Sequence, residues 1–254
     1  MNIYITGDCH GDFQRFTTRN FPQLKGLNRD DCMIICGDHG GVWAGEQADG
    51  HKLDWLEDKP FTTLFVDGNH ENFDLLNAYP EQVWHGGRVH VVRPHVLHLM
   101  RRQVFEIGGL TWFTMGGAAS HDIEDGILDP AAPDFEQRYW ALRRTNARFR
   151  VLGRSWWPEE MPSEAEYAEA ETNLEHTGWC VDCILTHCAP TSIAQNMKRH
   201  YQPDELTDFL ETVRQRCRFS RWFCGHYHIN QVIDGRFVIQ WEQISKIEAD
   251  SIRK

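Results

Sequence analysis

The sequence predicts an α/β protein in which a parallel or mixed β-sheet is covered by helices on both sides. Three short apolar runs, at residues 3–5, 32–36 and 62–66, are each followed by a glycine and a polar residue. Near-continuous apolar runs are typical of strands that are buried on both faces. Helical patterns near 12–20 and 51–58 separate the runs, and this β-α-β order favours a parallel or mixed sheet.

The remaining elements continue the alternation of strands and helices. A strand-rich middle is expected at 88–92, 95–100, 103–107 and 110–115, with Gly108-Gly109 as a hairpin turn. Ser163 and Glu166 form a capping-box pattern that begins a helix reaching about His176. A buried strand is expected at 181–185 and a helix from Pro203 to about Cys217. The last strands are expected at 219–224, 229–233 and 237–242, with Asp234-Gly235 as a hairpin turn.

Length and composition limit the classes of protein that this chain can represent. A chain of 254 residues suits one domain, predicted to span 1–254, with an inserted segment at about 116–162. The formal charge of −11 repels nucleic-acid phosphates at long range, which disfavours general nucleic-acid binding. Neither a signal-peptide pattern nor a run of about 20 apolar residues, as a membrane span needs, is visible. We therefore expect a cytoplasmic protein without a membrane partner, whose 8 cysteines are reduced. The isolated C-x-x-C pair, Cys180 and Cys183, is a weak candidate for a structural zinc site.

Residues that commonly bind metal ions gather where predicted strands end. In open α/β sheets the loops at the carboxyl ends of strands converge, so residues far apart in the sequence can meet in one cleft. Neighbouring glycines allow the backbone to approach a bound ion closely. If the local segments are extended, Asp8 and His10 point the same way, as do His226 and His228, and each pair can hold one ion. The residues at strand ends are Asp8, His10, Asp38, Asn69, His70, His187, His226 and His228.

Carboxylate, amide and imidazole groups together indicate a site for two divalent ions. Such mixed ligands favour Mn²⁺, with Fe, Zn²⁺, Ni²⁺ and Co²⁺ as alternatives. Two ions about 3.5–4 Å apart need a bridging group, and Asp38, alone in its cluster, is the best candidate. The ions would lower the pKa of a shared water toward ~7, which makes a bridging hydroxide available. A histidine beside the ions would protonate the leaving group.

The order of these clusters resembles the pattern of the calcineurin-like metallophosphoesterases, which runs D-x-H, G-D, G-N-H-[DE], H and G-H-x-H. All five blocks occur in order between Asp8 and His228. The resemblance implies a four-layer α/β fold, with a central mixed β-sandwich flanked by helices and the metal site at the carboxyl ends of the strands. His70 would lie over the phosphate as the leaving-group acid, and Asn69 would also contact substrate. By the same resemblance Asp8, His10 and His228 would hold one ion, Asn69, His187 and His226 the other, and Asp38 would bridge them.

These patterns predict a binuclear metal-dependent hydrolase of phosphate esters. The substrate would be a phosphomonoester or phosphodiester, either a small molecule or nucleotide-like. A serine/threonine phosphoprotein phosphatase is the weaker alternative. That branch carries an arginine in G-D-x-x-D-R-G, whereas this chain continues Gly37-Asp38-His39-Gly40-Gly41-Val42-Trp43. A non-catalytic metal-binding scaffold is disfavoured because none of the ligands is missing.

His39 and Glu71, which adjoin the sequence blocks, are each open to two interpretations. His39 either fills space or adds a hydrogen bond to substrate. Glu71 either supports metal-bound groups or lies in the first turn of a helix, where its charge is favourable.

The segment 116–162 departs from a minimal catalytic core. Guanidinium groups bind phosphate in a bidentate manner and tryptophans stack on bases, so the segment is a candidate for selecting a nucleotide or a nucleic-acid end. Arg154 is the predicted substrate contact. The alternative is a solvated helix whose arginines pair with carboxylates, with both tryptophans in the core. We assign no role to Ser120, His121 and Asp122, which follow the pair Gly116-Gly117. The basic and aromatic residues of the segment are Arg138, Arg143, Arg144, Arg148, Arg150, Arg154, Trp156 and Trp157.

Overall fold

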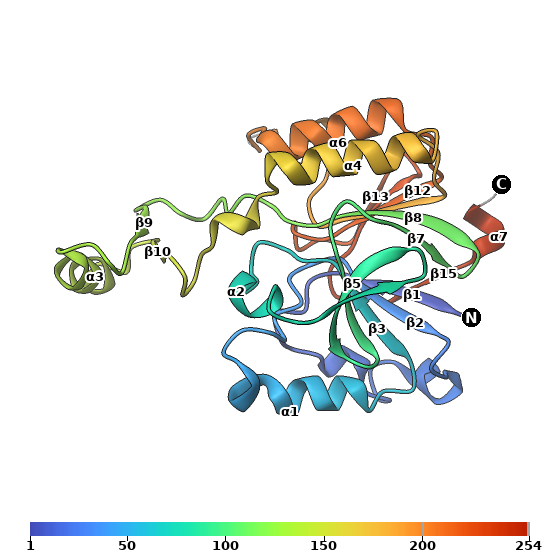
Figure 1. Ribbon diagram of the computed structural model, residues 1–254, viewed down its shortest axis with the longest axis horizontal. Helices are drawn as coiled ribbons and strands as arrows, with labels where there is room; N and C mark the ends of the chain where they lie inside the picture. The colour runs from blue at the N-terminus through green and yellow to red at the C-terminus, as the bar shows by residue number, and fades with distance from the viewer. Residues whose placement is uncertain (200, 253–254) are drawn as a thin grey trace.

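The computed structural model describes residues 1–199 and 201–252, and in it two β-sheets pack against each other between outer helices (Figure 1). The first sheet has the order β15-β1-β2-β3-β6-β5-β4. Its centre is parallel, from β1 through β2 and β3 to β6, whereas β15, β5 and β4 are antiparallel to their neighbours. Its strands are β1 (Ile3–Thr6), β2 (Cys32–Ile35), β3 (Thr62–Phe65), β4 (Glu81–Trp84), β5 (Gly87–Arg93), β6 (Val96–Leu99) and β15 (Ser245–Ile247).

The second sheet has the order β13-β14-β12-β11-β8-β7. The strands β8, β11, β12 and β14 are parallel, and the edge strands β7 and β13 are antiparallel to them. Both edge hairpins turn where the sequence predicts, at Gly108-Gly109 and at Asp234-Gly235, and all four turn residues have positive φ. The strands are β7 (Val104–Ile107), β8 (Leu110–Met115), β11 (Cys183–Thr186), β12 (Arg221–Cys224), β13 (Gln231–Ile233) and β14 (Phe237–Ile239).

The alternation of side chains along each strand divides the core into three apolar layers. Between the sheets, Ile5 and Leu64 of the first pack with Phe223 of the second in one buried cluster. The opposite face of the first sheet packs under α1 (Glu46–Glu57), and that of the second packs under α4 (Glu164–His176) and α6 (Glu205–Arg216). Successive side chains of a strand point to opposite faces, so fully apolar strands bury both faces. The predicted four-layer α/β fold is confirmed.

One predicted helix is wrong. Within 12–20 the chain forms the short 3₁₀ turn η1 (Gln14–Phe16), with irregular backbone on either side, and η2 (Pro22–Gly26) follows. Thr17 leaves η1 with extended backbone, and Phe21 precedes a proline, a place where helical backbone is disfavoured. The helices predicted from Ser163 and from Pro203 correspond to α4 and α6. The second begins after a capping box on Asp204 and Thr207 rather than at Pro203. Outside the segment 116–162, the sequence did not predict α2 (Phe73–Leu76), α5 (Thr191–Met197), α7 (Ala249–Ile252), β4 and β15.

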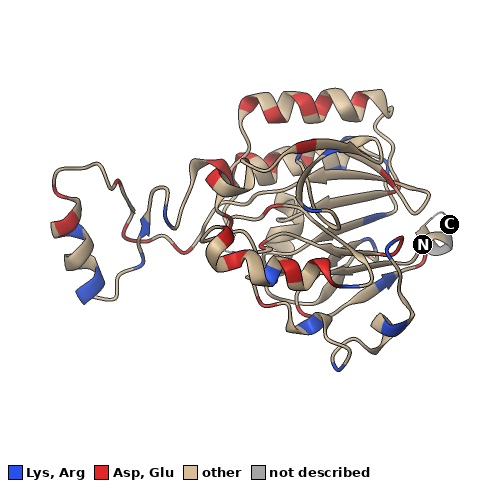
Figure 2. Cartoon of the chain, turned by 60° about the horizontal axis from the view of Figure 1, so that its bottom comes forward, with Lys and Arg blue, Asp and Glu red and all other residues tan. Residues whose placement is uncertain are grey.

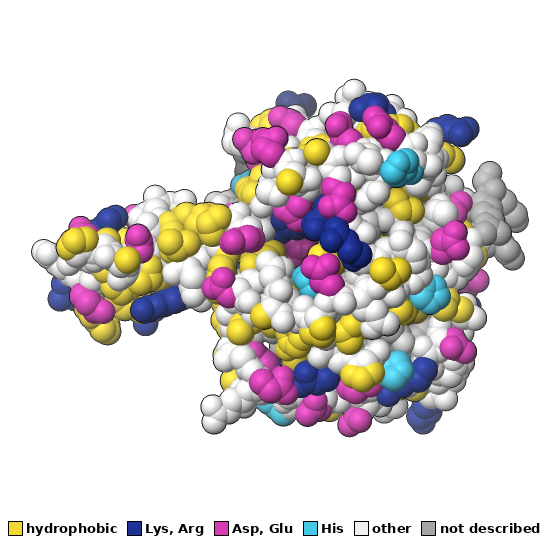
Figure 3. All heavy atoms as spheres, in the orientation of Figure 1, with side chains coloured by type: hydrophobic (Ala, Val, Ile, Leu, Met, Phe, Trp, Pro, Cys, Tyr) yellow, Lys and Arg dark blue, Asp and Glu magenta, His cyan; other side chains and the backbone are white. Residues whose placement is uncertain are grey.

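Residues 121–157, here called the arm, leave the body of the molecule between β8 and α4 (Figure 1). The arm contains β9 (Ile127–Leu128), α3 (Phe135–Arg144) and β10 (Arg150–Val151), and η3 (Pro158–Glu160) follows it. Its helix packs on a small apolar cluster of its own, and hydrophobic side chains gather over its surface in Figure 3. Trp140 is 56% exposed there.

The arm carries charges of both signs (Figure 2). Arg148 pairs with Glu124 and Arg150 pairs with Asp122. Trp157 is buried and Trp156 is half-buried. The two ion pairs and the burial of Trp157 agree with the alternative interpretation, whereas Arg148 and Arg150 lie beyond α3 and Trp156 is only half-buried. Across the described residues, the helices are too short or too polar to cross a lipid bilayer.

Candidate metal centre

The residues predicted to bind metal lie in the loops that follow five strands. β1, β2 and β3 are parallel neighbours in one sheet, and β11 and β12 are parallel neighbours in the other. Their carboxyl ends therefore open toward one side of the molecule, where the loops converge. Two groups of possible ligands, each with its ligand atoms within 4.8 Å of one another, lie there.

The first group contains Asp8, His10 and His228. His228 Nε2 lies 3.0 Å from Asp8 Oδ2, and His10 Nε2 lies 4.0 Å from the same oxygen. The two ring nitrogens are 3.1 Å apart. Asp8 Oδ2 is buried, and its partners there are the two imidazoles, since no hydrogen bond of good geometry reaches it. One carboxylate oxygen and two imidazole nitrogens form a ligand set that suits a divalent transition metal.

The second group contains Asp8, Asp38 and His187. His187 Nε2 lies 3.4 Å from Asp38 Oδ1 and 3.3 Å from Asn69 Oδ1. Asp38 also faces the first group, because its Oδ2 lies 3.8 Å from His10 Nε2. Two carboxylates, Asp8 and Asp38, thus lie between the histidines, and the bridging role of Asp38 stays a prediction.

The rings of His226 and His228 lie beside different ligand residues, and the expectation of an extended backbone at this pair is wrong. The His226 ring lies 5.0 Å from the His187 ring, whereas His228 approaches Asp8 and His10. Neither segment is extended, since φ is +47° at His10, +67° at His226 and +50° at His228. Asp38 also has a positive φ, of +45°. Non-glycine residues rarely adopt this conformation, which costs about 1–3 kcal/mol each and occurs at functional sites that the surrounding fold holds in place.

Glycines beside the ligands provide room for this arrangement. A Cβ added to Gly68 would lie 2.0 Å from Asp38 Oδ1, and one added to Gly225 would lie 2.2 Å from Asp8 Oδ1. At Gly37 a Cβ would lie 2.1 Å from His187 Nδ1. Each distance is far below van der Waals contact. The glycines of the sequence blocks therefore allow ligand side chains to lie directly against backbone.

The charges of the centre favour a bound cation. Burial lowers the pKa of His187, but the carboxylate of Asp38 outweighs this effect and raises it to about 10. Burial raises the pKa of Asp38, and the facing histidines more than reverse that effect. Burial, with the neighbouring His187, holds the pKa of His226 well below its usual value, so its imidazole is neutral. The buried carboxylates thus require positive charge nearby, which either a protonated histidine or a metal ion supplies.

Ring orientation also fits metal binding. His187 Nδ1 lies 2.7 Å from the carbonyl oxygen of Cys36 and donates to it. This bond holds the ring with Nε2 facing the Asp38 and Asn69 oxygens, as a ligand must be held. The backbone N–H of His226 donates to Asp8 Oδ1 at 3.0 Å, and that of His70 donates to Asp38 Oδ1 at 2.8 Å. The residues present fit a pair of divalent ions.

The neighbours of the blocks take structural positions. His39 is fully buried, stacks on Phe65 with ring centroids 4.0 Å apart, and has its pKa lowered to about 3 by burial. Glu71 is buried and accepts from the backbone N–H groups of His39 and Gly40. His39 therefore fills space, and Glu71 holds the loop that carries Asp38. His70 is half-buried, with its ring 5.5 Å from that of His10.

Several residues at the centre were not assigned a role from the sequence. His121 lies beside His226, with ring centroids 5.7 Å apart, and Trp241 stacks on His228 at 5.6 Å. Ser120 accepts a hydrogen bond from Asn69 Nδ2 and donates one to Glu160. Ser120 follows the pair Gly116-Gly117 and was given no role from the sequence, and no pattern pointed to Glu160.

Arg154 is not brought to the ligands. It is exposed in the turn after β10, with its guanidinium carbon 5.4 Å from the centre of the Phe135 ring. Together with Tyr139, Arg143 and Arg150 it lines a cavity of about 380 Å³ on the arm. Asn69, by contrast, lies among the ligands.

Comparison with known proteins agrees with the geometry of this centre. The family model described as calcineurin-like phosphoesterase matches residues 1–230. This range contains all the predicted ligands and the arm. A search of the curated proteins found no match.

Proposed function

The chain belongs to the calcineurin-like phosphoesterase family, and from this premise we propose that it hydrolyses phosphate esters with two divalent metal ions. Membership of the family implies metal-dependent hydrolysis of phosphoesters. The number of ions and the residues that hold them are our proposal. The observation that carries it is the pair of ligand groups around Asp8 and Asp38, each within 4.8 Å.

We assign one ion to Asp8, His10 and His228, and the other to Asn69, His187 and His226. Asp38 is placed as the bridge because its two oxygens face different groups, Oδ1 toward His187 and Oδ2 toward His10. Mn²⁺ is the ion we expect for this mixture of oxygen and nitrogen ligands. When bound, such ions make a nucleophile available from water near neutral pH and offset the charge on the phosphoryl oxygens.

His70 is the candidate acid for the leaving oxygen. Its backbone is tied to Asp38, and its ring is half-buried beside His10, so a phosphate at the ions would lie within its reach. The imidazole would protonate the ester oxygen as its bond to phosphorus breaks. This role matters most for poor leaving groups, which need the proton.

The alternatives fit less well. The loop that carries an arginine in phosphoprotein phosphatases here packs Trp43 edge-on against Trp157, with ring centroids 5.7 Å apart. That loop supports the base of the arm and supplies no guanidinium. A non-catalytic scaffold would be expected to have lost ligands, whereas each expected ligand is present.

Arg154 is proposed as a distal substrate contact rather than a contact to the hydrolysed phosphate. The arm cavity combines arginines with Tyr139 and Phe149, a combination that suits a second phosphate or a base of a nucleotide-like substrate. The Arg154→Ala variant should raise KM for a nucleotide ester and leave the rate with a small dye ester unchanged. A loss shared by both substrates would contradict the distal role.

The proposed activity is tested with a phosphomonoester and a phosphodiester dye substrate. The protein is first stripped with chelator and then supplied with Mn²⁺ in steps. We expect turnover that rises with two equivalents of metal in the wild type and is lost in Asp38→Asn. His51→Ala, an exposed histidine of α1, is the matched control and should retain wild-type turnover. Turnover that does not respond to metal would contradict the proposal.

A further inference from the structure

We propose that Ser120 and Glu160, at the base of the arm, are positioning residues that orient the Asn69 amide toward the second metal ion. This inference rests on the proposed function, in which Asn69 binds that ion. Neither residue belongs to the five sequence blocks. Both come from the segment that departs from a minimal core.

The three side chains form a hydrogen-bonded chain with one direction. Asn69 Nδ2 donates to Ser120 Oγ at 3.0 Å, and Ser120 Oγ donates to Glu160 Oε2 at 2.7 Å. The backbone N–H of Ser120 donates to the other oxygen, Glu160 Oε1, at 2.9 Å. A carboxylate only accepts, so the hydroxyl proton is committed to Glu160 and Oγ is left as an acceptor.

This direction decides which end of the amide faces the ion. Because Ser120 Oγ can only accept, it requires the NH₂ end of Asn69. The carbonyl oxygen is therefore turned the other way, where His187 Nε2 lies 3.3 Å from it. A flipped amide would bring Oδ1 against the lone pairs of Oγ and would present NH₂, which is no ligand, to the metal.

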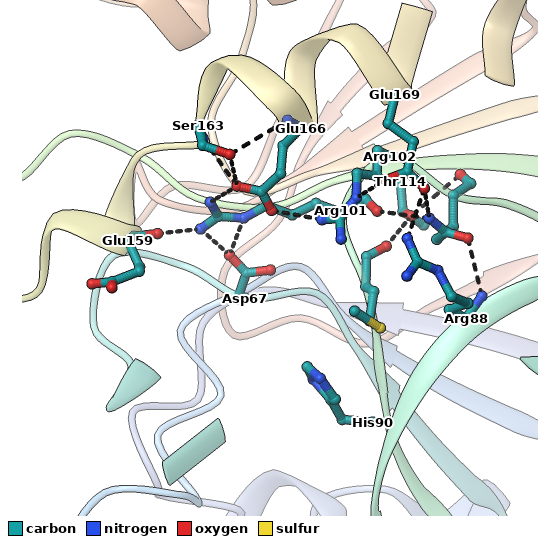
Figure 4. Close-up of polar contacts among 12 residues, drawn as sticks. Asp67, Arg88, His90, Arg101, Arg102, Thr114, Glu159, Ser163, Glu166 and Glu169 are labelled. Carbon is teal, nitrogen blue, oxygen red and sulfur yellow. Dashed lines mark hydrogen bonds and ion pairs between the residues drawn. The ribbon is translucent and has the colours of Figure 1, made fainter. Parts of the chain in front are cut away.

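Glu160 is held firmly enough to act as the support. It is 5% exposed, and its carbonyl oxygen accepts from the backbone N–H of Ala118. Next to it, Glu159 accepts through its carbonyl oxygen from Arg101 Nη2 at 2.7 Å (Figure 4). Arg101 in turn binds Asp67 Oδ2 through Nε at 2.8 Å, two residues before Asn69. The base of the arm is thus tied to the same loop that it orients.

The inference predicts a selective effect. The contacts of Ser120 reach Asn69 and not the group of Asp8, His10 and His228, so only the second ion should depend on Ser120 and Glu160. Loss of a group that orients a metal ligand typically weakens binding about 10- to 100-fold. A merely structural role would weaken both ions, or neither.

The test measures stepwise Mn²⁺ affinity by equilibrium dialysis of the full chain. Ser120→Ala removes the acceptor, whereas Ser120→Thr keeps the hydroxyl and should retain the second ion. Glu160→Gln replaces one carboxylate oxygen with an NH₂ group. If that group faces Ser120 Oγ, it donates to the hydroxyl and reverses the direction of the hydrogen bond; if it faces the Ser120 backbone N–H, two donors oppose each other. We expect a weaker second ion in Ser120→Ala and Glu160→Gln, by about 10- to 100-fold, and an unchanged first ion. Matched controls are Ser155→Ala and Glu159→Gln, which change a hydroxyl and an exposed carboxylate of the same segment and should bind as the wild type does.

A second readout does not need metal. In the NMR spectrum of metal-free protein, the side-chain amide protons of Asn69 should exchange slowly in the wild type and rapidly in Ser120→Ala. Equal second-ion affinity in the wild type, Ser120→Ala and Glu160→Gln, or unchanged exchange, would overturn the positioning role. A wild-type protein that binds no second ion would instead overturn the proposed function, while the amide exchange would still decide the role of Ser120.

Discussion

Replacing Gly68 with alanine tests how tightly the metal-binding loops are packed. The added Cβ would lie 2.0 Å from Asp38 Oδ1 and 2.5 Å from the Asp38 backbone nitrogen. Ordinary carbon contacts begin at about 3.5 Å. The Asp38 side chain, or the loop that carries it, must therefore move by more than about 1 Å, and the nearby backbone nitrogen prevents the side chain from yielding alone.

The size of the effect follows from that displacement. A misplacement of about 1 Å at a reacting group is enough to lower turnover about 100-fold. Overpacking of this kind costs about 1–3 kcal/mol of folding free energy. For a chain of this size each kcal/mol lowers Tm by roughly 2–4 °C, so we expect Gly68→Ala to remain folded at 25 °C with Tm lower by roughly 2–12 °C.

The assay compares kcat with the phosphomonoester dye, Mn²⁺ stoichiometry and thermal unfolding. Gly26→Ala is the matched control, because a Cβ there meets no atom within 4 Å. That variant should keep wild-type turnover and stability within about 1 kcal/mol. A Gly68→Ala protein with normal turnover and two tightly bound ions would refute the packing argument, since it would require room that the Asp38 loop does not have.

Other predictions concern the leaving group, the support of the arm and the response to acid. His70→Ala should slow cleavage of poor leaving groups while leaving good ones nearly normal; an equal loss for both would contradict its acid role. Arg101→Met leaves buried Asp67 without its guanidinium partner and should cost about 3–5 kcal/mol in urea unfolding, whereas a loss below about 1 kcal/mol would contradict the importance of this pair. Burial raises the pKa of Glu211, but its hydrogen bonds to Arg214 and Ser192 outweigh this and lower it from 4.5 to about 2. Because the pKa of Glu211 is lower in the folded than in the unfolded protein, its ionised carboxylate stabilises the fold above pH 4.5. This stabilisation is lost as the pH falls toward 2, so Glu211→Gln should lower Tm at pH 6 and have little effect near pH 2. A Tm difference independent of pH would argue against that linkage.

The features that sequence could predict are those written in local patterns. The apolar runs before Gly7, Gly37 and Gly68 correspond to strands β1, β2 and β3, and the capping box at Ser163 begins α4. The family indicated by the five blocks is confirmed by the match over residues 1–230. These patterns depend on few neighbours, so they can be recognised without the tertiary structure.

The features that sequence could not predict depend on contacts between distant segments. The positive φ at His10 and His226 is imposed by the surrounding loops, and neither position has the glycine that would have indicated such a backbone in the sequence. In place of the expected helix over 12–20 there is a 3₁₀ turn that ends at the extended Thr17, and the stacked rings of Phe13 and Phe16 are buried there against the body of the protein. Glu160 reaches Ser120 only because the arm leaves the body and returns between them, and no periodicity encodes that path.

The central claim is that the strand-end loops hold two ions side by side. The most direct measurement is anomalous diffraction at the manganese edge from crystals reconstituted with Mn²⁺. We predict two peaks, one bounded by Asp8, His10 and His228 and the other by Asn69, His187 and His226, with Asp38 between them. A centre with no peak, or one ion bound elsewhere, would contradict it.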